Sequence, residues 1–210
     1  MGVCYIVGAG DFYGEINPSE DDLVIAADGG YNALISHGIR VDLLIGDLDS
    51  LTEAPIGVEI LRFPPVKDET DSFLAYSEGV RRGYTDFRLY GCVGGREDHT
   101  YANYSLLLYA RRRSHRAYLY AKDGVSFVLA NEGAVLKGEG GKYFSLFALS
   151  ASAEGVFVKG AKYSTEGVTL HSDFPLGVSN EFLGSDTRVF VKNGELLVMA
   201  QTLITPSFFD

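Results

Sequence analysis

The first 121 residues alternate between short apolar runs and segments whose apolar residues recur at helical spacing, and this alternation restricts the chain to few folds. We predict strands at 3–8, 23–28, 41–46, 58–63, 86–90 and 117–121, and helices at 31–38, at 68–83 and from about Asp98 to about Arg113. Strand–helix alternation of this kind is typical of an α/β domain with a doubly wound, mainly parallel sheet.

The pattern changes after about Asp123. Six β-rich runs are separated by glycine turns, and no segment has a convincing helical pattern: 125–130, 133–138, 142–149, 155–160, 187–194 and 195–201. Asn193–Gly194 stands between the last two runs and predicts a β-hairpin. We therefore expect an α/β domain at 1–123 and an all-β sandwich domain at 124–210.

Charge and composition exclude several classes of protein. The net charge of −10 and the pI near 4.8 argue against a nucleic-acid partner, because a duplex-binding protein needs a basic surface. No apolar run approaches the roughly 18 residues that span a bilayer, and the start of the chain lacks the basic region of a signal peptide. Cys4 and Cys92 lie in apolar runs without metal-ligand spacing. We therefore expect buried free thiols, a cytoplasmic protein and no membrane partner.

Acidic residues stand where four of the predicted strands end. Because ligands of open parallel sheets bind beyond the carboxyl ends of the strands, we expect these acids at one edge of the sheet. They are Asp28, then Asp47 and Asp49, then Asp68 and Asp71, and finally Asp98. Crowded carboxylates repel one another, so a divalent cation, for which Mg²⁺ is the expected ion, would hold them together.

Each acid also has a simpler interpretation. Asp28–Gly29 would fit a turn, and the pair after the strand at 41–46 would fit a helix cap and a turn. Asp68 and Asp71 have the spacing of an N-cap residue and its N3 partner, and Asp98 would be favoured by the dipole at a helix start. The coincidence of four strand ends favours a functional site over capping alone.

The anion that accompanies the cation is predicted to be phosphate. Gly94–Gly95 leave backbone N–H groups accessible before a helix start, where phosphates bind. Arg96 offers a planar fork for phosphate oxygens, and Lys67 offers a second cation. The segment 8–14, with sequence GAGDFYG, is a weaker candidate for a loop that faces phosphate, and no Walker sequence is present.

Three blocks, AADGGYNALISHGIRVDLLIGDLDS, VKDETDSFLA and GGREDHTYANYSLL, together resemble the thiamin pyrophosphokinase family in order and spacing. In the second half, YFSLFALS, GVFVKGAKY and LGVSNEF also resemble segments of that family. The resemblance covers nearly the full chain. It implies an enzyme that moves the pyrophosphoryl group of ATP to the hydroxyl of thiamin, giving thiamin diphosphate and AMP.

The same resemblance implies Mg²⁺, an ATP-binding catalytic domain at 1–123 and a thiamin-binding and dimerisation domain at 124–210. It also implies a homodimer with active sites between the subunits. The implied site residues fall into three groups. The metal and phosphate-site acids are Asp47, Asp49, Asp68, Asp71 and Asp98; the ATP contacts are Asp28, Lys67, Thr70, Gly94, Gly95 and Arg96, with a contact from His99 and Asn103; the thiamin contacts are Ser179 and Asn180.

The chain departs from the family in two places. Ser164–Thr165 stand where many relatives have Pro and Leu, and no tryptophan is present to stack on thiamin. The aromatic candidates for that contact are Phe182, Phe174, Tyr163 and His171.

The implied mechanism is in-line attack of the thiamin hydroxyl on the β-phosphorus of ATP, in which positioning and charge neutralisation dominate. Either Asp71 or Asp98 would accept the hydroxyl proton. Three alternatives stay open: a Mg²⁺-dependent phosphohydrolase with the same acids, a sensor that binds thiamin or nucleotide without turnover, and a protein whose acids only cap helices. Formation of AMP only when thiamin is present would separate the first alternative from the transferase.

Overall fold

The computed structural model describes residues 2–13, 15–47, 57–64 and 68–210. The chain divides into two compact units, Met1–Lys122 and Asp123–Asp210, a division one residue away from the predicted boundary. The two units are described separately. The functions that we assigned to the two parts stay predictions at this stage.

The first unit contains a parallel sheet. Its strands are β1 (Cys4–Val7), β2 (Leu23–Ala27), β3 (Leu43–Gly46), β4 (Glu59–Arg62), β5 (Asp86–Tyr90) and β6 (Arg116–Ala121), in the order β6-β5-β1-β2-β3-β4. Each neighbouring pair is parallel. The strands β1, β2 and β3 are buried throughout, which explains why they read as continuous apolar runs.

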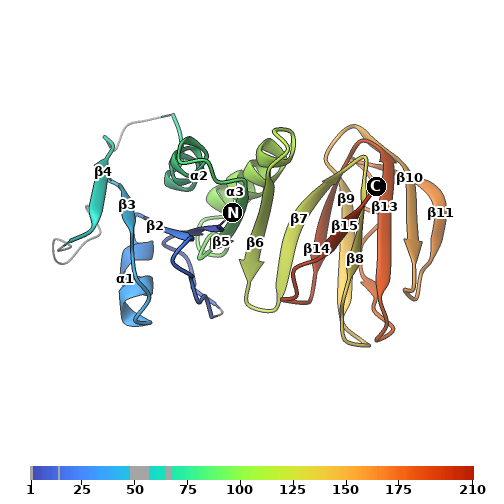
Figure 1. Cartoon of the computed structure of the whole chain (residues 1–210). Helices are drawn as coiled ribbons and strands as arrows, with labels where there is room; N and C mark the ends of the chain where they lie inside the picture. Colours follow the sequence, from blue (N-terminus) through green and yellow to red (C-terminus); the bar gives the residue numbers. More distant parts are fainter. Residues whose placement is uncertain (1, 14, 48–56, 65–67) are drawn as a thin grey trace. The chain divides into compact units, whose positions relative to one another are not determined.

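Three helices pack on this sheet: α1 (Gly30–Ser36), α2 (Asp71–Arg81) and α3 (Glu97–Arg111). Helix α1 contacts β1 and β2, α2 contacts β1, β2 and β3, and α3 contacts β6 and α2. In Figure 1, α1 lies below the strands and α2 and α3 lie above them. The predicted α/β class is confirmed. No helix joins β1 to β2 among the residues described there, so the finer description as a doubly wound sheet stays a prediction.

The start of α2 corrects one prediction. Thr70, not Asp68, is the N-cap residue, and its hydroxyl accepts a hydrogen bond of 3.2 Å from the backbone N–H of Phe73. A threonine oxygen satisfies the open N–H of the first turn, so Asp68 stays outside the helix and Asp71 begins it. The carboxylate of Asp68 is therefore not used in capping.

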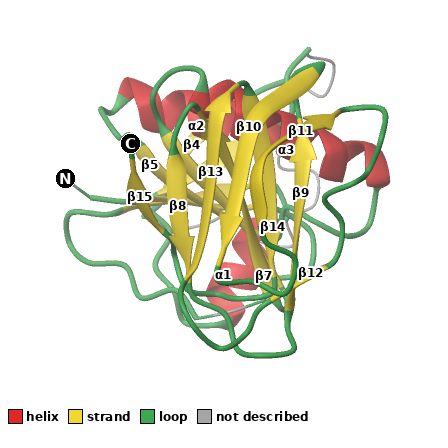
Figure 2. Cartoon of the chain, turned by 90° about the vertical axis from the view of Figure 1, so that its right-hand side faces the viewer, coloured by secondary structure: helices red, strands yellow, loops and turns green. Residues whose placement is uncertain are grey.

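The second unit is an antiparallel β-sandwich. One sheet has the order β12-β9-β14-β7 and the other has the order β11-β10-β13-β8-β15. The strands are β7 (Gly124–Ala130), β8 (Gly133–Leu136), β9 (Tyr143–Ala148), β10 (Ser152–Lys159), β11 (Thr165–His171), β12 (Asn180–Glu181), β13 (Thr187–Asn193), β14 (Glu195–Ala200) and β15 (Ser207–Phe209). Figure 2 looks onto these strands, and residues 123–210 contain no helix, as predicted.

The predicted hairpin at Asn193–Gly194 is wrong. Strand β13 pairs with β10 and β8, whereas β14 pairs with β7 and β9, so this turn passes from one sheet to the other. A two-residue hairpin turn of the favoured type needs positive φ at both central residues. Gly194 has φ 103°, but Asn193 does not have a positive φ. The strands β11, β12 and β15 were not predicted.

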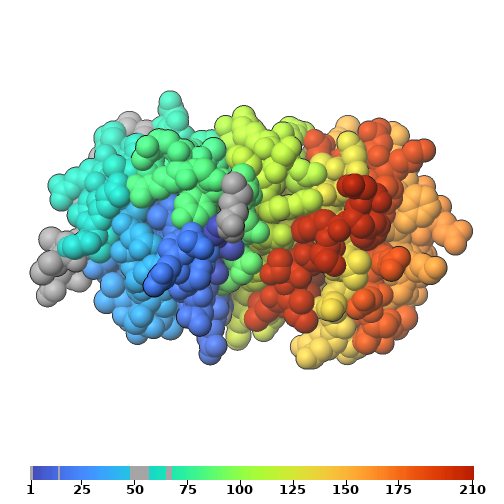
Figure 3. Space-filling model, in the orientation of Figure 1, coloured from blue at the N-terminus to red at the C-terminus, as the bar shows by residue number. Residues whose placement is uncertain are grey.

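The prediction of buried free thiols is confirmed. Cys4 and Cys92 are both free and buried. No helix in the described part of the chain is long and apolar enough to cross a membrane. On the face seen in Figure 3, the C-terminal segment, in dark red, lies at the surface, in agreement with the exposed side chains of Leu203 and Ile204.

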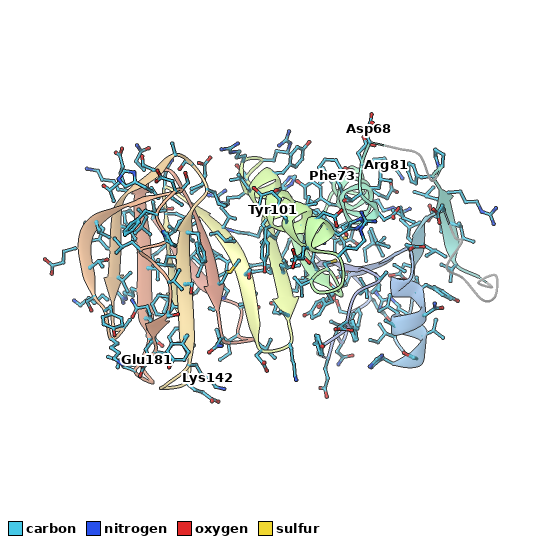
Figure 4. The ribbon with its side chains drawn as sticks, turned by 180° about the vertical axis from the view of Figure 1, so that it is seen from behind. Asp68, Phe73, Arg81, Tyr101, Lys142 and Glu181 are labelled. Atoms are coloured by element: carbon cyan, nitrogen blue, oxygen red, sulfur yellow. The ribbon has the colours of Figure 1, made fainter. Side chains whose placement is uncertain are left out.

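An ion-pair network closes the C-terminal end of α2. The carboxylate of Glu78, whose side chain is only 10% exposed, lies 2.6 Å from Nη2 of Arg81 and 2.7 Å from Nε of Arg82. Arg81, labelled in Figure 4, is itself largely exposed. The hydrogen bond from Arg81 lowers the pKa of Glu78 from 4.5 to about 2; burial opposes this shift and Arg82 supports it.

Because this pKa is lowered in the folded state, the pair stabilises the protein fully above pH 4.5 and loses its effect as the pH falls toward 2. We predict that Glu78→Gln lowers the free energy of unfolding by about 1–2 kcal/mol at pH 7, after allowance for the exposed Arg81. The loss at pH 3 should be less than half as large. Urea unfolding at the two pH values tests this, with Glu20→Gln as the exposed control, and equal losses at both would contradict it.

Candidate active site

The ends of β2 and β3 bring two predicted acids to one edge of the sheet. Asp28 follows β2 in a left-handed conformation with φ 50°, and its backbone N–H donates to the carbonyl of Ile45 over 2.7 Å. A Cβ on Gly46 would lie 3.2 Å from Cα of Asp28. The two strand ends therefore touch at Asp28 and Gly46, and Asp47 follows Gly46 in the chain.

The ends of β1 and β5 are joined in the same way. The N–H of Gly8 donates to the carbonyl of Tyr90, and the N–H of Gly10 donates to the carbonyl of Gly91, each over 2.8 Å. A Cβ on Gly10 would lie 2.8 Å from the carbonyl oxygens of both Gly91 and Val93, so only glycine fits at this position. The segment after β1 thus supports the loop between β5 and α3.

That loop carries the two predicted phosphate-facing glycines. Gly94 and Gly95 have φ of 83° and 67°, in the left-handed region that glycine tolerates best. Both are exposed, and a Cβ on Gly95 would meet nothing within 4 Å. The N–H groups of such a loop, just before the start of α3, suit a phosphate.

Cys92 and Asn103 anchor the base of this loop. Asn103 on α3 is 5% exposed, and its side-chain amide donates to the carbonyl of Cys92 over 2.7 Å. The Cys92 thiol lies 3.8 Å from the hydroxyl of Ser72 on α2, and burial raises the pKa of that thiol to about 11. Cys92 is therefore an inert contact between the β5 end and the first turns of both helices.

Arg96 and Asp98 form an exposed ion pair on this loop. Nη2 of Arg96 lies 2.6 Å from Oδ2 of Asp98, and Nε lies 3.1 Å from Oδ1, so the contact is bidentate. The hydrogen bond from Arg96 lowers the pKa of the Asp98 carboxyl, and the carboxylate raises the pKa of Arg96. Solvent screens such an exposed pair, so it contributes little to stability.

The remaining predicted residues of the first unit lie around the starts of α2 and α3. Thr70 caps α2, Asp71 begins it, and Asp68 is exposed just before it. His99 is exposed on the first turn of α3, whereas Asn103 is buried and uses its amide within the fold. A nucleotide contact by Asn103 stays a prediction.

Two predicted residues, Asp49 and Lys67, lie outside the described residues. Among the residues that the structure does describe, no three His, Cys, Asp or Glu side chains come together as ligands of one metal ion. The donor chemistry nevertheless suits Mg²⁺, which takes one or two carboxylates together with phosphate oxygens and water. Among the described acids predicted for the metal, Asp47 follows β3, and Asp68 and Asp98 are exposed at the starts of α2 and α3.

The predicted substrate residues of the second unit line an apolar cavity of about 580 Å³. Asn180 is buried, and its amide donates to the carbonyl of Tyr163 over 2.7 Å while its Oδ1 accepts from the N–H of Tyr163 over 3.0 Å. Ser179 is exposed with φ 60°, and its N–H donates to the hydroxyl of Ser145. The cavity lining comprises Leu146, Val156, Val158, Tyr163, Thr165, Val168, Leu170, Leu176, Gly177, Val178, Ser179 and Asn180.

The structure separates the four aromatic candidates. Phe182 is 0% exposed and packs against Phe144, so its ring cannot reach a ligand without unfolding. Phe174 is exposed but does not line the cavity, and the same holds for His171. Tyr163 is 60% exposed and lines the cavity beside Asn180. It is thus the best placed of the four.

Two features of the first unit were not predicted from the sequence. Asp11, in the weakly considered segment after β1, places Oδ2 3.8 Å from where a Cβ of Gly94 would lie. A cavity of about 450 Å³ also lies between α2 and α3, lined by Asp68, Glu69, Thr70, Phe73, Tyr101, Ala102, Ser105, Leu106 and Tyr109. The large aromatic residue Tyr101, on the exposed face of α3, was the one sequence feature that could have indicated this cavity.

Comparison with known proteins supports the predicted family. Residues 18–119 match the catalytic domain of thiamin pyrophosphokinase, and residues 134–198 match its vitamin B1 binding domain. The chain belongs to the thiamin pyrophosphokinase family. Its function is that of the family: thiamin pyrophosphokinases transfer the pyrophosphoryl group of ATP to the hydroxyl of thiamin.

Individual relatives agree with this assignment. The chain is 25% identical to a thiamine pyrophosphokinase of Bacillus subtilis over 190 residues, which cover 87% of this chain and 89% of the relative. Crystal structures of thiamin pyrophosphokinases from Bacillus subtilis and Geobacillus thermodenitrificans have TM-scores of 0.86 and 0.83, each at 24% identity. They cover 96% and 95% of this chain, and 100% and 97% of the relatives. At this identity the structures support the fold.

We predict that Asn103→Leu lowers the free energy of unfolding by about 1–3 kcal/mol, because it leaves the buried carbonyl of Cys92 without a donor. His99→Ala, at an exposed position on the same helix, should change stability by less than about 0.5 kcal/mol. Urea unfolding of the two variants and the unchanged protein measures both. Equal stability of Asn103→Leu and the unchanged protein would contradict the anchoring role.

Proposed function

We propose that pyrophosphoryl transfer takes place at the edge of the first unit where β2, β3 and β5 end, with Mg²⁺ bound among the carboxylates. The observation that supports this proposal is the contact between the ends of β2 and β3, which holds the backbone of Asp28 against Gly46, the residue before Asp47. The glycine loop before α3 supplies N–H groups for phosphate. These groups match the needs of phosphoryl chemistry, which depends on positioning and on neutralisation of charge.

We assign Asp47, Asp49, Asp68 and Asp98 to Mg²⁺, with Asp28 beside the nucleotide. When bound, Mg²⁺ would neutralise the phosphate oxygens and hold them in line with the attacking hydroxyl. Arg96 and Lys67 would offset the charge that develops on the transferred group. Asp71 or Asp98 would accept the proton of the thiamin hydroxyl.

The Arg96–Asp98 pair suggests how the loop responds to substrate. Without ligand, each side chain neutralises the other. With ATP and a cation present, Arg96 would turn to phosphate and Asp98 to the metal, so that each exchanges one opposite charge for another. Because both charges stay compensated, the exchange would need little free energy.

The thiamin pyrimidine is assigned to the second unit, where Ser179 and Asn180 line an apolar cavity and Tyr163 offers an exposed ring. An apolar cavity with a few polar groups is the usual form of a small-molecule site. The family resemblance adds two further proposals. One is a homodimer with active sites between the subunits. The other is a cytoplasmic location, which the two free thiols support.

A direct assay tests the reaction. We predict that the protein incubated with ATP, Mg²⁺ and thiamin forms AMP and thiamin diphosphate in equal amounts, as measured by chromatography. Without thiamin, AMP formation should fall to background. AMP or ADP released at the same rate without thiamin would instead indicate a phosphohydrolase, and thiamin binding without any product would indicate a sensor.

The metal role has its own test. We predict that Asp47→Asn and Asp49→Asn each lower kcat by at least about 100-fold, because each removes a charge that stabilises the phosphate site. Circular dichroism should show an unchanged fold, and Glu20→Gln should keep full activity. Normal turnover of the Asn variants at saturating Mg²⁺ would rule out the assigned role.

A further inference from the structure

The pair Asn193–Gly194 has no part in the proposed reaction, but it combines two reactive groups. Asn193 is the only asparagine of the chain that a glycine follows. The backbone nitrogen of the next residue can attack an asparagine side-chain amide, and glycine, which has no side chain, hinders this attack least. Asn193 is exposed and Gly194 is half-buried, so water reaches the pair.

The fold requires glycine at position 194. This residue alone connects β13 in one sheet to β14 in the other, and its φ is 103°. A Cβ at this position would lie 2.7 Å from the carbonyl oxygen of Ser152 and 2.8 Å from Oγ of Ser150. Since a larger residue would meet both the backbone and a side chain here, the crossing between the sheets keeps a glycine after Asn193.

Neighbouring side chains hold both reacting groups. The N–H of Gly194, which contains the attacking nitrogen, donates to Oδ1 of Asn131 over 2.9 Å. The amide of Asn193, which is the group attacked, donates to Oε2 of Glu154 over 3.5 Å, and Glu154 is its partner on the neighbouring strand β10. The nitrogen of Gly194 must therefore give up a hydrogen bond before it can react. Opening of the turn, rather than the closed structure, limits the reaction.

We propose that Asn193 is a site of spontaneous deamidation and that Asn131 restrains it. The nitrogen of Gly194, after loss of its proton, forms a bond to Cγ of Asn193, and the bond from Cγ to the side-chain nitrogen breaks. That nitrogen takes up a proton and leaves as ammonia, which gives a cyclic imide. Water then adds to one of the two imide carbonyls and breaks its C–N bond, so the products are aspartate and isoaspartate.

The modification changes the turn in two ways. A carboxylate at position 193 would face Glu154 in place of an amide that donates to it, and like charges directly opposite destabilise a sheet. Isoaspartate also adds a backbone atom to a connection that consists of one residue. Protein modified at this position is therefore expected to unfold at lower urea concentration. This inference does not depend on the proposed function.

Peptide mapping by mass spectrometry tests the proposal on the full-length protein, incubated in warm buffer of mildly alkaline pH. Aspartate and isoaspartate should accumulate at position 193 before they appear at Asn32, which is also exposed but precedes Ala33. The rate should rise with pH, because the attacking nitrogen must lose its proton. It should also be higher in urea, where the contact with Asn131 is absent.

Variants at position 131 separate the restraint from the fold. Asn131→Gly keeps a residue that tolerates the φ of 53° but removes the amide. Modification of Asn193 should then be about three- to tenfold faster, the range that corresponds to the loss of one ordinary hydrogen bond. Asn131→Asp keeps an acceptor oxygen and should react at nearly the unchanged rate. Circular dichroism confirms that each variant is folded.

Several results would overturn the proposal. Modification of Asn32 ahead of Asn193, or none at position 193 in Asn131→Gly, would rule out the deamidation site. Equal rates in Asn131→Gly and the unchanged protein would rule out the restraint by Asn131. If Asn131→Gly does not fold, the unchanged protein still decides the restraint, because equal rates at position 193 with and without urea would show that the fold does not protect it.

Discussion

The hydrogen bond from Asn103 to the carbonyl of Cys92 is the interaction on which the proposed catalytic edge depends. It ties the first half of α3 to the end of β5, and the Cys92–Ser72 contact extends the connection to α2. Two glycines that follow β1, Gly8 and Gly10, join it to the end of β5 through main-chain hydrogen bonds. Because these contacts are buried, they hold the exposed loop of Gly94 and Gly95 on a rigid base, which is how precise sites are usually built.

Above that base, the charged groups are exposed. Arg96 and Asp98 pair with each other on the surface, and Asp68 lies outside its helix because Thr70 takes the capping position. Buried contacts therefore set the position of the loop, while its charged side chains stay accessible to a ligand. The net charge of −10 favours the approach of a cationic acceptor and disfavours the approach of a nucleotide that carries no metal ion.

Much of this organisation was readable from the sequence. The apolar runs predicted the parallel strands, because buried strands show no polar alternation. The acids at the strand ends were chosen because ligands of parallel sheets bind there, and their roles stay predictions. Four features of this organisation were not predicted. The Thr70 cap was missed because Asp68 and Asp71 also have the spacing of a capping pair. The path of the turn at Asn193 depends on which sheet each strand joins. The α2–α3 cavity and the buried role of Asn103 depend on tertiary packing, which local patterns do not encode.

The way Asn180 holds Tyr163 has a consequence for how the cavity of the second unit can change. The three hydrogen bonds of that amide all go to main-chain atoms, two of them on Tyr163 and one on Glu181, so the loop keeps its shape whatever side chain stands at position 163. The ring itself contributes little to the core because it is mostly exposed. Exchange of Tyr163 for a larger or smaller aromatic residue therefore reshapes the wall of the cavity at little cost in folding stability.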